Sequence, residues 1–159
     1  MPYETLSFTG NTLRRGFWIY VWEVTAPDGY VHHYVGRTGD SSSLNAASPF
    51  LRVGRHLDSR TNAKANSLHK RLTDANLDPK TCSFHLHAVG PLFPEQTTRE
   101  DHALHRNVLG RIEFELADRL RSTVIGNHQR PRTFDQTLFE TTLALVLTEL
   151  SPHLPTLIR

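Results

Sequence analysis

The strongest constraint on the fold is a pair of short apolar segments joined by a tight turn. Residues 17–24 and 30–36 are rich in aromatic and β-branched side chains, which favour extended strands. The intervening segment APDG, residues 26–29, is typical of a turn, because proline fixes φ and glycine tolerates a positive φ. The pattern predicts a β-hairpin with Tyr20 on its first strand and Tyr34 on its second.

The rest of the chain alternates between helical and extended patterns. After a polar loop at 40–47, Ser48 as N-cap and Pro49 in the first turn predict a short helix that ends near Leu57. Further expected elements are a helix at 65–76, a half-buried strand at 81–89, a chain break at 90–96 (GPLFPEQ), a long helix at 98–121 and a final helix at 135–150. This order predicts an α+β domain whose small mixed or antiparallel three-stranded sheet is flanked by helices.

The final helix is apolar over much of its circumference, in the segment LFETTLALVLTEL. Such a helix either packs on several sides or forms a subunit contact, which would make the protein a homodimer. We expect an N-terminal extension at 1–15, a core domain at 16–130 and a C-terminal helix and tail at 131–159.

Composition narrows the class of protein. The chain of 159 residues is long enough for one domain with its own core. Its single cysteine, Cys82, excludes an internal disulfide framework and a cysteine-based zinc site, and it fits a reducing cytoplasm. The N-terminus lacks a basic segment followed by an apolar run, and no apolar stretch approaches the ~20 residues of a membrane span. We therefore expect a cytoplasmic protein without a signal peptide or a membrane partner.

Positive charge is concentrated in one part of the chain. The net charge is only +2, but between residues 52 and 71 six basic side chains accompany one acid, Asp58. The basic residues are Arg52, Arg55, Arg60, Lys64, Lys70 and Arg71. This run is either a patch that attracts phosphates or a solvated helical face.

Five elements, taken in order, resemble the GIY-YIG endonuclease superfamily. The tripeptides WIY (18–20) and YVG (34–36) resemble its paired signature, and PFLRVGRHL places Arg52 and His56 one turn apart on the following helix. The segment IEFELADRL carries Glu113 on a long helix, and GN then supplies Asn127. The likeness spans roughly residues 17 to 127. It departs from the family pattern at Trp18, which replaces glycine, and in a longer loop before Arg52.

The resemblance implies a nuclease that uses Mg²⁺ or Mn²⁺, with Glu113 as metal ligand. Glu115 is the rival on the same helix. Leu109, Leu116 and Ala117 frame Glu113 at helical spacing, which places its base against the core. Glu115 has charged neighbours at the same spacings, so we favour Glu113, and a carboxylate with several waters suits Mg²⁺.

The same resemblance assigns the other catalytic roles. Arg52 would contact the scissile phosphate and stabilise its developing charge. His56, four residues later, would take a proton from a tyrosine hydroxyl or from water. Tyr20 would act on the water nucleophile with that help, and Tyr34 would position the phosphate. Each residue also has a structural alternative, since tyrosines pack in strands and arginine and histidine lie on helix surfaces.

Further residues are expected to bind substrate. Gly36 would permit close backbone approach, and Asn127 would fix loop geometry or contact a phosphate. The longer loop leaves Arg37 and Arg55 as alternatives to Arg52. Together with Lys64, these basic residues would follow the nucleic-acid backbone.

Histidine pairs raise the separate question of zinc. His85 and His87 share one face of the expected strand, and His102 and His105 lie three apart on a helix. No acidic or cysteine residue lies beside them at ligand spacing, so we do not expect a histidine zinc site.

The sequence thus favours a metal-dependent endonuclease that hydrolyses phosphodiester bonds, with DNA preferred over RNA. Two alternatives belong to other classes. One is a nucleic-acid-binding module of the same fold that does not cleave, and the other is an assembly protein that acts through its C-terminal helix.

Overall fold

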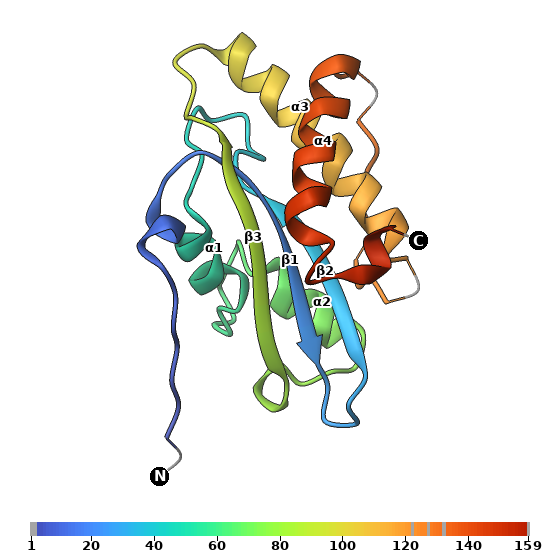
Figure 1. Ribbon diagram of the computed structural model, residues 1–159. Coiled ribbons are helices and arrows are strands. Elements are labelled where there is room, and N and C mark those ends of the chain that lie inside the picture. Colours follow the sequence, from blue (N-terminus) through green and yellow to red (C-terminus); the bar gives the residue numbers. More distant parts are fainter. Residues whose placement is uncertain (1–2, 122, 127, 132, 159) are drawn as a thin grey trace.

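A computed structural model describes residues 3–121, 123–126, 128–131 and 133–158 of the chain. In order, its elements are a 3₁₀ turn η1 (Gly10–Leu13), strands β1 (Phe17–Thr25) and β2 (Val31–Arg37), helices α1 (Pro49–His56) and α2 (Ser67–Asp74), a 3₁₀ turn η2 (Pro79–Thr81), strand β3 (Ser83–Phe93), helices α3 (Arg99–Arg119) and α4 (Gln136–Leu150), and a 3₁₀ turn η3 (Pro155–Ile158). The expected α+β class is confirmed (Figure 1).

The sheet is antiparallel, with strand order β2-β1-β3. β1 is the central strand and pairs with the other two along most of its length. The predicted hairpin is present, and its turn closes through a bond from the Gly29 amide to the Ala26 carbonyl at 2.9 Å. Gly29 has φ +84°, a conformation that favours glycine.

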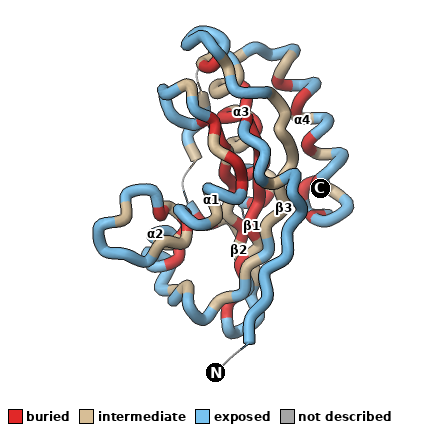
Figure 2. Tube along the Cα trace, turned by 90° about the vertical axis from the view of Figure 1, so that its left-hand side faces the viewer, coloured by how far each residue is buried: buried red, intermediate tan, exposed pale blue. Residues whose placement is uncertain are grey.

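The side chains of β1 alternate between two hydrophobic cores, one on each face of the sheet. Phe17, Ile19 and Val21 pack in the core that also contains α3 and α4. Tyr20, Trp22 and Val24 pack in a second core with Leu68 and Leu72 of α2. The molecule therefore has three layers, with α2 and α4 on opposite sides of the sheet (Figure 2).

Three helices begin with a side-chain cap at or next to the residue where the sequence predicted the helix to begin. Ser48 accepts a hydrogen bond from the Leu51 amide at 3.3 Å, and Asp135 accepts one from Leu138 at 2.8 Å. Thr98 caps α3 by accepting from the Asp101 amide at 3.1 Å. These caps satisfy amide groups that have no partner within the helix.

The sequence predicted that the third strand ends before a chain break at 90–96, and this position is wrong. β3 continues through Gly90 and Pro91 to Phe93. Proline is tolerated because β3 is an edge strand, and the pairing with β1 shifts register between Phe17 and Ile19. Gly90 is also required there, since a Cβ atom would lie 2.7 Å from the Trp18 ring.

The C-terminal helix uses one face for packing. Phe139, Thr142, Val146 and Leu150 are buried, whereas Leu145 is 58% exposed. On α3, Leu104 was expected in the apolar stripe of the helix, but it is 39% exposed and does not share the burial of Val108, Leu109 and Ile112. Within the described ranges, none of the helices combines the length and the apolar character that a membrane crossing requires.

Candidate active site

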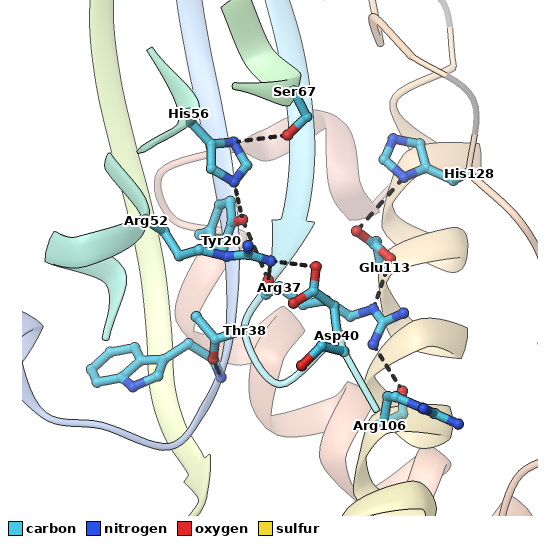
Figure 3. A network of polar contacts seen from close by, with 12 residues as sticks. Tyr20, Arg37, Thr38, Asp40, Arg52, His56, Ser67, Arg106, Glu113 and His128 are labelled. Carbon is cyan, nitrogen blue, oxygen red and sulfur yellow. Dashed lines mark hydrogen bonds and ion pairs between the residues drawn. The ribbon is translucent and has the colours of Figure 1, made fainter. Parts of the chain in front are cut away.

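A polar pocket of about 280 Å³ lies where the end of β2 meets α1, α2 and α3. Eight of the ten residues predicted from the sequence line it: Tyr20, Tyr34, Gly36, Arg37, Arg52, His56, Lys64 and Glu113. Figure 3 shows the polar contacts at its centre. Arg55 instead lines an adjoining pocket of about 460 Å³, and Asn127 lies outside the described residues.

The buried hydroxyl of Tyr20 faces His56 at the end of α1. Tyr20 Oη lies 3.1 Å from His56 Nε2 and 3.4 Å from the Arg37 carbonyl oxygen. Burial raises the pKa of Tyr20, while the nearby Arg52 charge opposes this shift. The phenol is therefore protonated at neutral pH, and its proton is within reach of the imidazole.

Burial and, to a smaller extent, the positive charge of Arg52 lower the pKa of His56 to about 4. The imidazole is neutral at pH 7, so one ring nitrogen can accept a proton. When Nε2 accepts from Tyr20, the Nδ1 proton points to Ser67 Oγ at 3.5 Å. This arrangement makes His56 a proton acceptor for Tyr20.

Tyr34 joins the same group from β2. Its hydroxyl donates to Ser67 Oγ at 3.1 Å, and burial raises its pKa. The His56 ring meets the rings of Tyr20 and Tyr34 edge to face, at 5.7 and 5.6 Å between centroids. The two tyrosines of the hairpin thus hold His56 between them.

Gly36 lies opposite Tyr20 in the β1–β2 register. A Cβ atom at Gly36 would lie 2.6 Å from the Tyr20 hydroxyl oxygen, which no side chain can occupy without moving the phenol. The expected close backbone approach therefore occurs, and it is an approach to the Tyr20 ring.

Arg52 reaches the pocket from the middle of α1. Its Nη2 donates to the Arg37 carbonyl at 2.9 Å and pairs with Asp40 at 2.5 Å. Its Nε is buried and has no hydrogen-bond partner among the described residues. Arg52 thus offers one unused N–H donor beside the Tyr20–His56 pair.

Glu113 points from α3 to the end of β2. Its Oε2 accepts from Arg37 Nε at 2.9 Å, and Arg37 Nη1 also donates to the Arg106 carbonyl at 3.1 Å. The other oxygen, Oε1, lies 3.9 Å from His128 Nδ1. Burial lowers the pKa of His128, so this imidazole is neutral at pH 7 and its contact with Glu113 is not a charge pair.

Glu115, the rival acid, faces elsewhere. It pairs with Arg111 at 3.2 Å and with Arg119 at 3.3 Å along α3, and it does not line the pocket. The geometry therefore favours Glu113 as the acid of this site, as the apolar frame around it indicated.

The basic run does not form one continuous patch. Arg52 and Lys64 line the pocket, and Arg55 lines the adjoining pocket together with Arg15. Arg60 is instead turned to Asp58, with a side chain that is 77% exposed. Part of the run therefore faces the site, and part of it is solvated surface.

Three polar residues at or beside the pocket were not predicted. Asp40 pairs with Arg52, and His128 faces Glu113. Ser67 contacts both the Tyr34 hydroxyl and the His56 ring through its Oγ. Asp40 begins the loop at 40–47 and Ser67 begins α2. Nothing in a single sequence distinguishes them from other residues at the start of a loop or a helix. His128 follows the predicted Asn127 directly, and this adjacency is the sequence signal that could have pointed to it.

The donor set of the pocket fits a divalent ion of the Mg²⁺ type. Two carboxylates, Asp40 and Glu113, line one polar space, and Glu113 Oε1 accepts no hydrogen bond from the described residues. Mg²⁺ is commonly held by one or two carboxylates while it keeps several waters. Because Arg37 occupies the second oxygen, Glu113 would bind the ion through Oε1.

Comparison of the chain with known protein families, with curated proteins and with solved structures finds no match.

Proposed function

We propose that this chain is a divalent-metal-dependent endonuclease of the GIY-YIG type that hydrolyses phosphodiester bonds, with DNA preferred over RNA. The single observation that carries the proposal is a convergence in space. Side chains from β1, α1 and α3, far apart in the sequence, meet at one polar pocket: Tyr20, Arg52, His56 and Glu113. Their chemistry supplies a proton acceptor, a phosphate ligand and a carboxylate.

Arg52 would hold the scissile phosphate. Its unpaired Nε lies on the same edge of the guanidinium as Nη2, and a phosphate that replaces Asp40 at Nη2 would meet the planar fork that binds two oxygens. Lys64 in the same pocket and Arg55 in the adjoining one extend positive charge along the path of a nucleic-acid backbone, whereas Arg15 is paired with Glu95. Affinity should therefore fall with rising salt.

Tyr20 and His56 would act as a proton relay. The Tyr20 oxygen takes a proton from the attacking water as its own proton passes to His56 Nε2, across 3.1 Å. The water oxygen bonds to phosphorus, the bond to the leaving oxygen breaks, and solvent protonates that oxygen. Since the phenol exchanges one proton for another, the relay needs no free phenolate, which the raised pKa of Tyr20 disfavours.

Glu113 would complete the site by binding the metal. When bound there, Mg²⁺ or Mn²⁺ would neutralise charge on the phosphate oxygens. Arg37 orients the carboxylate through its bond to Oε2 and leaves Oε1 directed away from that pair.

The test is cleavage by the purified chain. Single-stranded, duplex and branched DNA and RNA are incubated with it in Mg²⁺, in Mn²⁺ or in chelator. We expect metal-dependent cleavage of at least one DNA substrate, lost in Tyr20→Phe, which keeps the ring but removes the hydroxyl. Cleavage that persists in Tyr20→Phe would overturn the role proposed for the Tyr20 hydroxyl.

A second candidate function is favoured by one observation. Arg37 pairs with Glu113 and Asp40 pairs with Arg52, so both key charges are already neutralised within the chain. A protein that keeps these pairs would bind nucleic acid without cutting it. Salt-sensitive binding of every DNA form, with no cleavage in either metal, would support this alternative.

We further propose a cytoplasmic location, which the single cysteine supports, and a homodimer contact through α4. The exposed Leu145 on α4 is the residue that such a contact would cover. Light scattering on the parent chain and on Leu145→Glu would test it, with a dimer expected only in the parent.

A further inference from the structure

A second cluster of ligating side chains lies on the face of the sheet opposite the pocket. Glu23 of β1 is paired with His85 of β3, and His87 follows two residues later, opposite Val21. Directly paired residues point to the same side of a sheet, as do residues two apart. Glu23, His85 and His87 therefore share the face of Val21, while Tyr20 lies on the other face.

The three side chains are spaced as ligands of one ion. Their ligand atoms lie within 4.8 Å of one another. His87 Nε2 is 2.8 Å and His85 Nδ1 is 3.9 Å from the same Glu23 oxygen. Ligand atoms around a tetrahedral zinc ion are about 3.4 Å apart, given bonds of 2.0–2.2 Å. Small rotations of the side chains would reach that geometry.

The surroundings support a metal more than a structural ion pair. Within the described ranges, every ion pair of Glu23 is with a histidine, and no lysine or arginine neutralises it. His33 Nε2 lies 3.7 Å from the second Glu23 oxygen, and its Nδ1 is 2.8 Å from the Thr123 hydroxyl. A ring nitrogen held in this way orients the imidazole, as outer partners do in metal sites.

One side of the cluster is open to solvent. The His85 side chain is 72% exposed, whereas that of His87 is 10% exposed. In Figure 1 the end of β1 and the start of β3 extend below α4, while the His87 ring lies 5.8 Å from that of His153, just after α4. An ion can therefore enter and keep a water as its fourth ligand.

We propose that Glu23, His85 and His87 form a site for a divalent transition metal, with Zn²⁺ as the best fit, and that His33 positions the carboxylate. Two imidazoles and one carboxylate suit Zn²⁺, whereas Mg²⁺ prefers oxygen ligands. His102, which the sequence grouped with these histidines, is elsewhere and bonds to the Ser41 carbonyl. The sequence analysis expected no histidine zinc site because it found no acid beside these histidines. Glu23 is that acid, and only the pairing of β1 with β3 brings it to His85.

The test measures metal binding directly and does not depend on the proposed nuclease. The full chain without a histidine tag is freed of metal by chelator, then titrated with ZnCl₂ by calorimetry and with CoCl₂ by visible absorption. We expect one tightly bound ion per chain, distinct from any ion at Glu113, with the intense absorption bands of four-coordinate Co²⁺. His87→Ala and Glu23→Gln should each weaken Zn²⁺ binding by about a hundredfold or more. Glu23→Gln is close in shape to the parent and serves if His87→Ala fails to fold.

Matched variants locate the ion. His32→Ala removes the neighbouring histidine of β2, which lies on the other sheet face, and should bind Zn²⁺ like the parent. Thr123→Val keeps all three ligands but releases His33, and should weaken binding by about tenfold. Glu113→Gln should leave the Co²⁺ spectrum unchanged. The proposal is overturned if no saturable binding of one ion occurs, or if Glu113→Gln removes it while His87→Ala does not.

Discussion

The Tyr20 hydroxyl lies 3.1 Å from His56 Nε2, inside a core where burial opposes charge on either group. Burial raises the pKa of the phenol and lowers that of the imidazole, so both are neutral at pH 7. Transfer of the phenol proton to the imidazole would leave two charges, which this burial opposes unless a proton from water replaces the one that leaves Tyr20. This relationship determines how stability should respond to acid.

His56 should make the fold sensitive to acid. Its pKa is about 4 in the folded chain, against about 6.5 when unfolded, so the unfolded state binds the proton more tightly. Its contribution to stability is complete above pH 6.5 and is lost as pH falls through 4. It should amount to about 3 kcal/mol between pH 7 and pH 4. Urea unfolding across this range should give a flatter pH dependence in His56→Gln; an identical slope would show that His56 titrates normally.

Glu113→Gln should abolish cleavage while largely preserving DNA binding. The amide cannot hold the metal as a carboxylate does, and we expect a loss of about a hundredfold or more in turnover. Glu115→Gln is the matched control, since Glu115 is on the same helix but pairs with Arg111 and Arg119 outside the pocket. Single-turnover cleavage and a binding assay in chelator measure the two properties separately. Equal rates for the two variants would refute the assignment of Glu113.

Arg52→Lys should lose turnover and affinity together. A lysine keeps the charge but lacks the planar fork that would bind two phosphate oxygens, so a fall of about 10²-fold in rate is expected. Arg60→Lys tests the specificity of this effect, because Arg60 belongs to the same basic run but faces Asp58 and solvent. If neither variant loses activity, the run acts only through its total charge, and if both lose it equally, the effect is not specific to Arg52.

Gly36→Ala should disturb the site through Tyr20. The added methyl group would overlap the phenol, which must move away from His56 at a cost of about 1–3 kcal/mol. Gly54→Ala is the control, since a Cβ there meets nothing within 4 Å and alanine favours the helix. Thermal unfolding should separate the two variants in opposite directions. A Gly36→Ala chain as stable and active as the parent would show that the phenol has room.

Local signals account for the parts of the fold that the sequence predicted. The turn at 26–29 and the caps Ser48, Thr98 and Asp135 act within four residues, so their consequences can be read from short segments. The length of β3 could not be read in this way. Pro91 ends a strand only when its missing N–H is needed by a partner, and that depends on which strand lies at the edge.

The same distinction applies to the site. Glu113 was favoured over Glu115 because helical spacing fixes which face of α3 is apolar. The Asp40–Arg52 pair was not predicted, because it depends on how a loop folds back over α1. Glu23 was missed for a related reason: its approach to His87 is set by the register between strands 64 residues apart in the chain.

The two proposed sites share the central strand, where their residues Tyr20 and Glu23 are three positions apart. Tyr20 and Glu23 project from opposite sides of β1, and this parity is preserved only while the strand stays in step with both neighbours. A single insertion or deletion between them would turn one of the two side chains to the wrong side of the molecule. Length changes within residues 20–23 should therefore be less tolerated than conservative substitutions there, including those at the buried Val21.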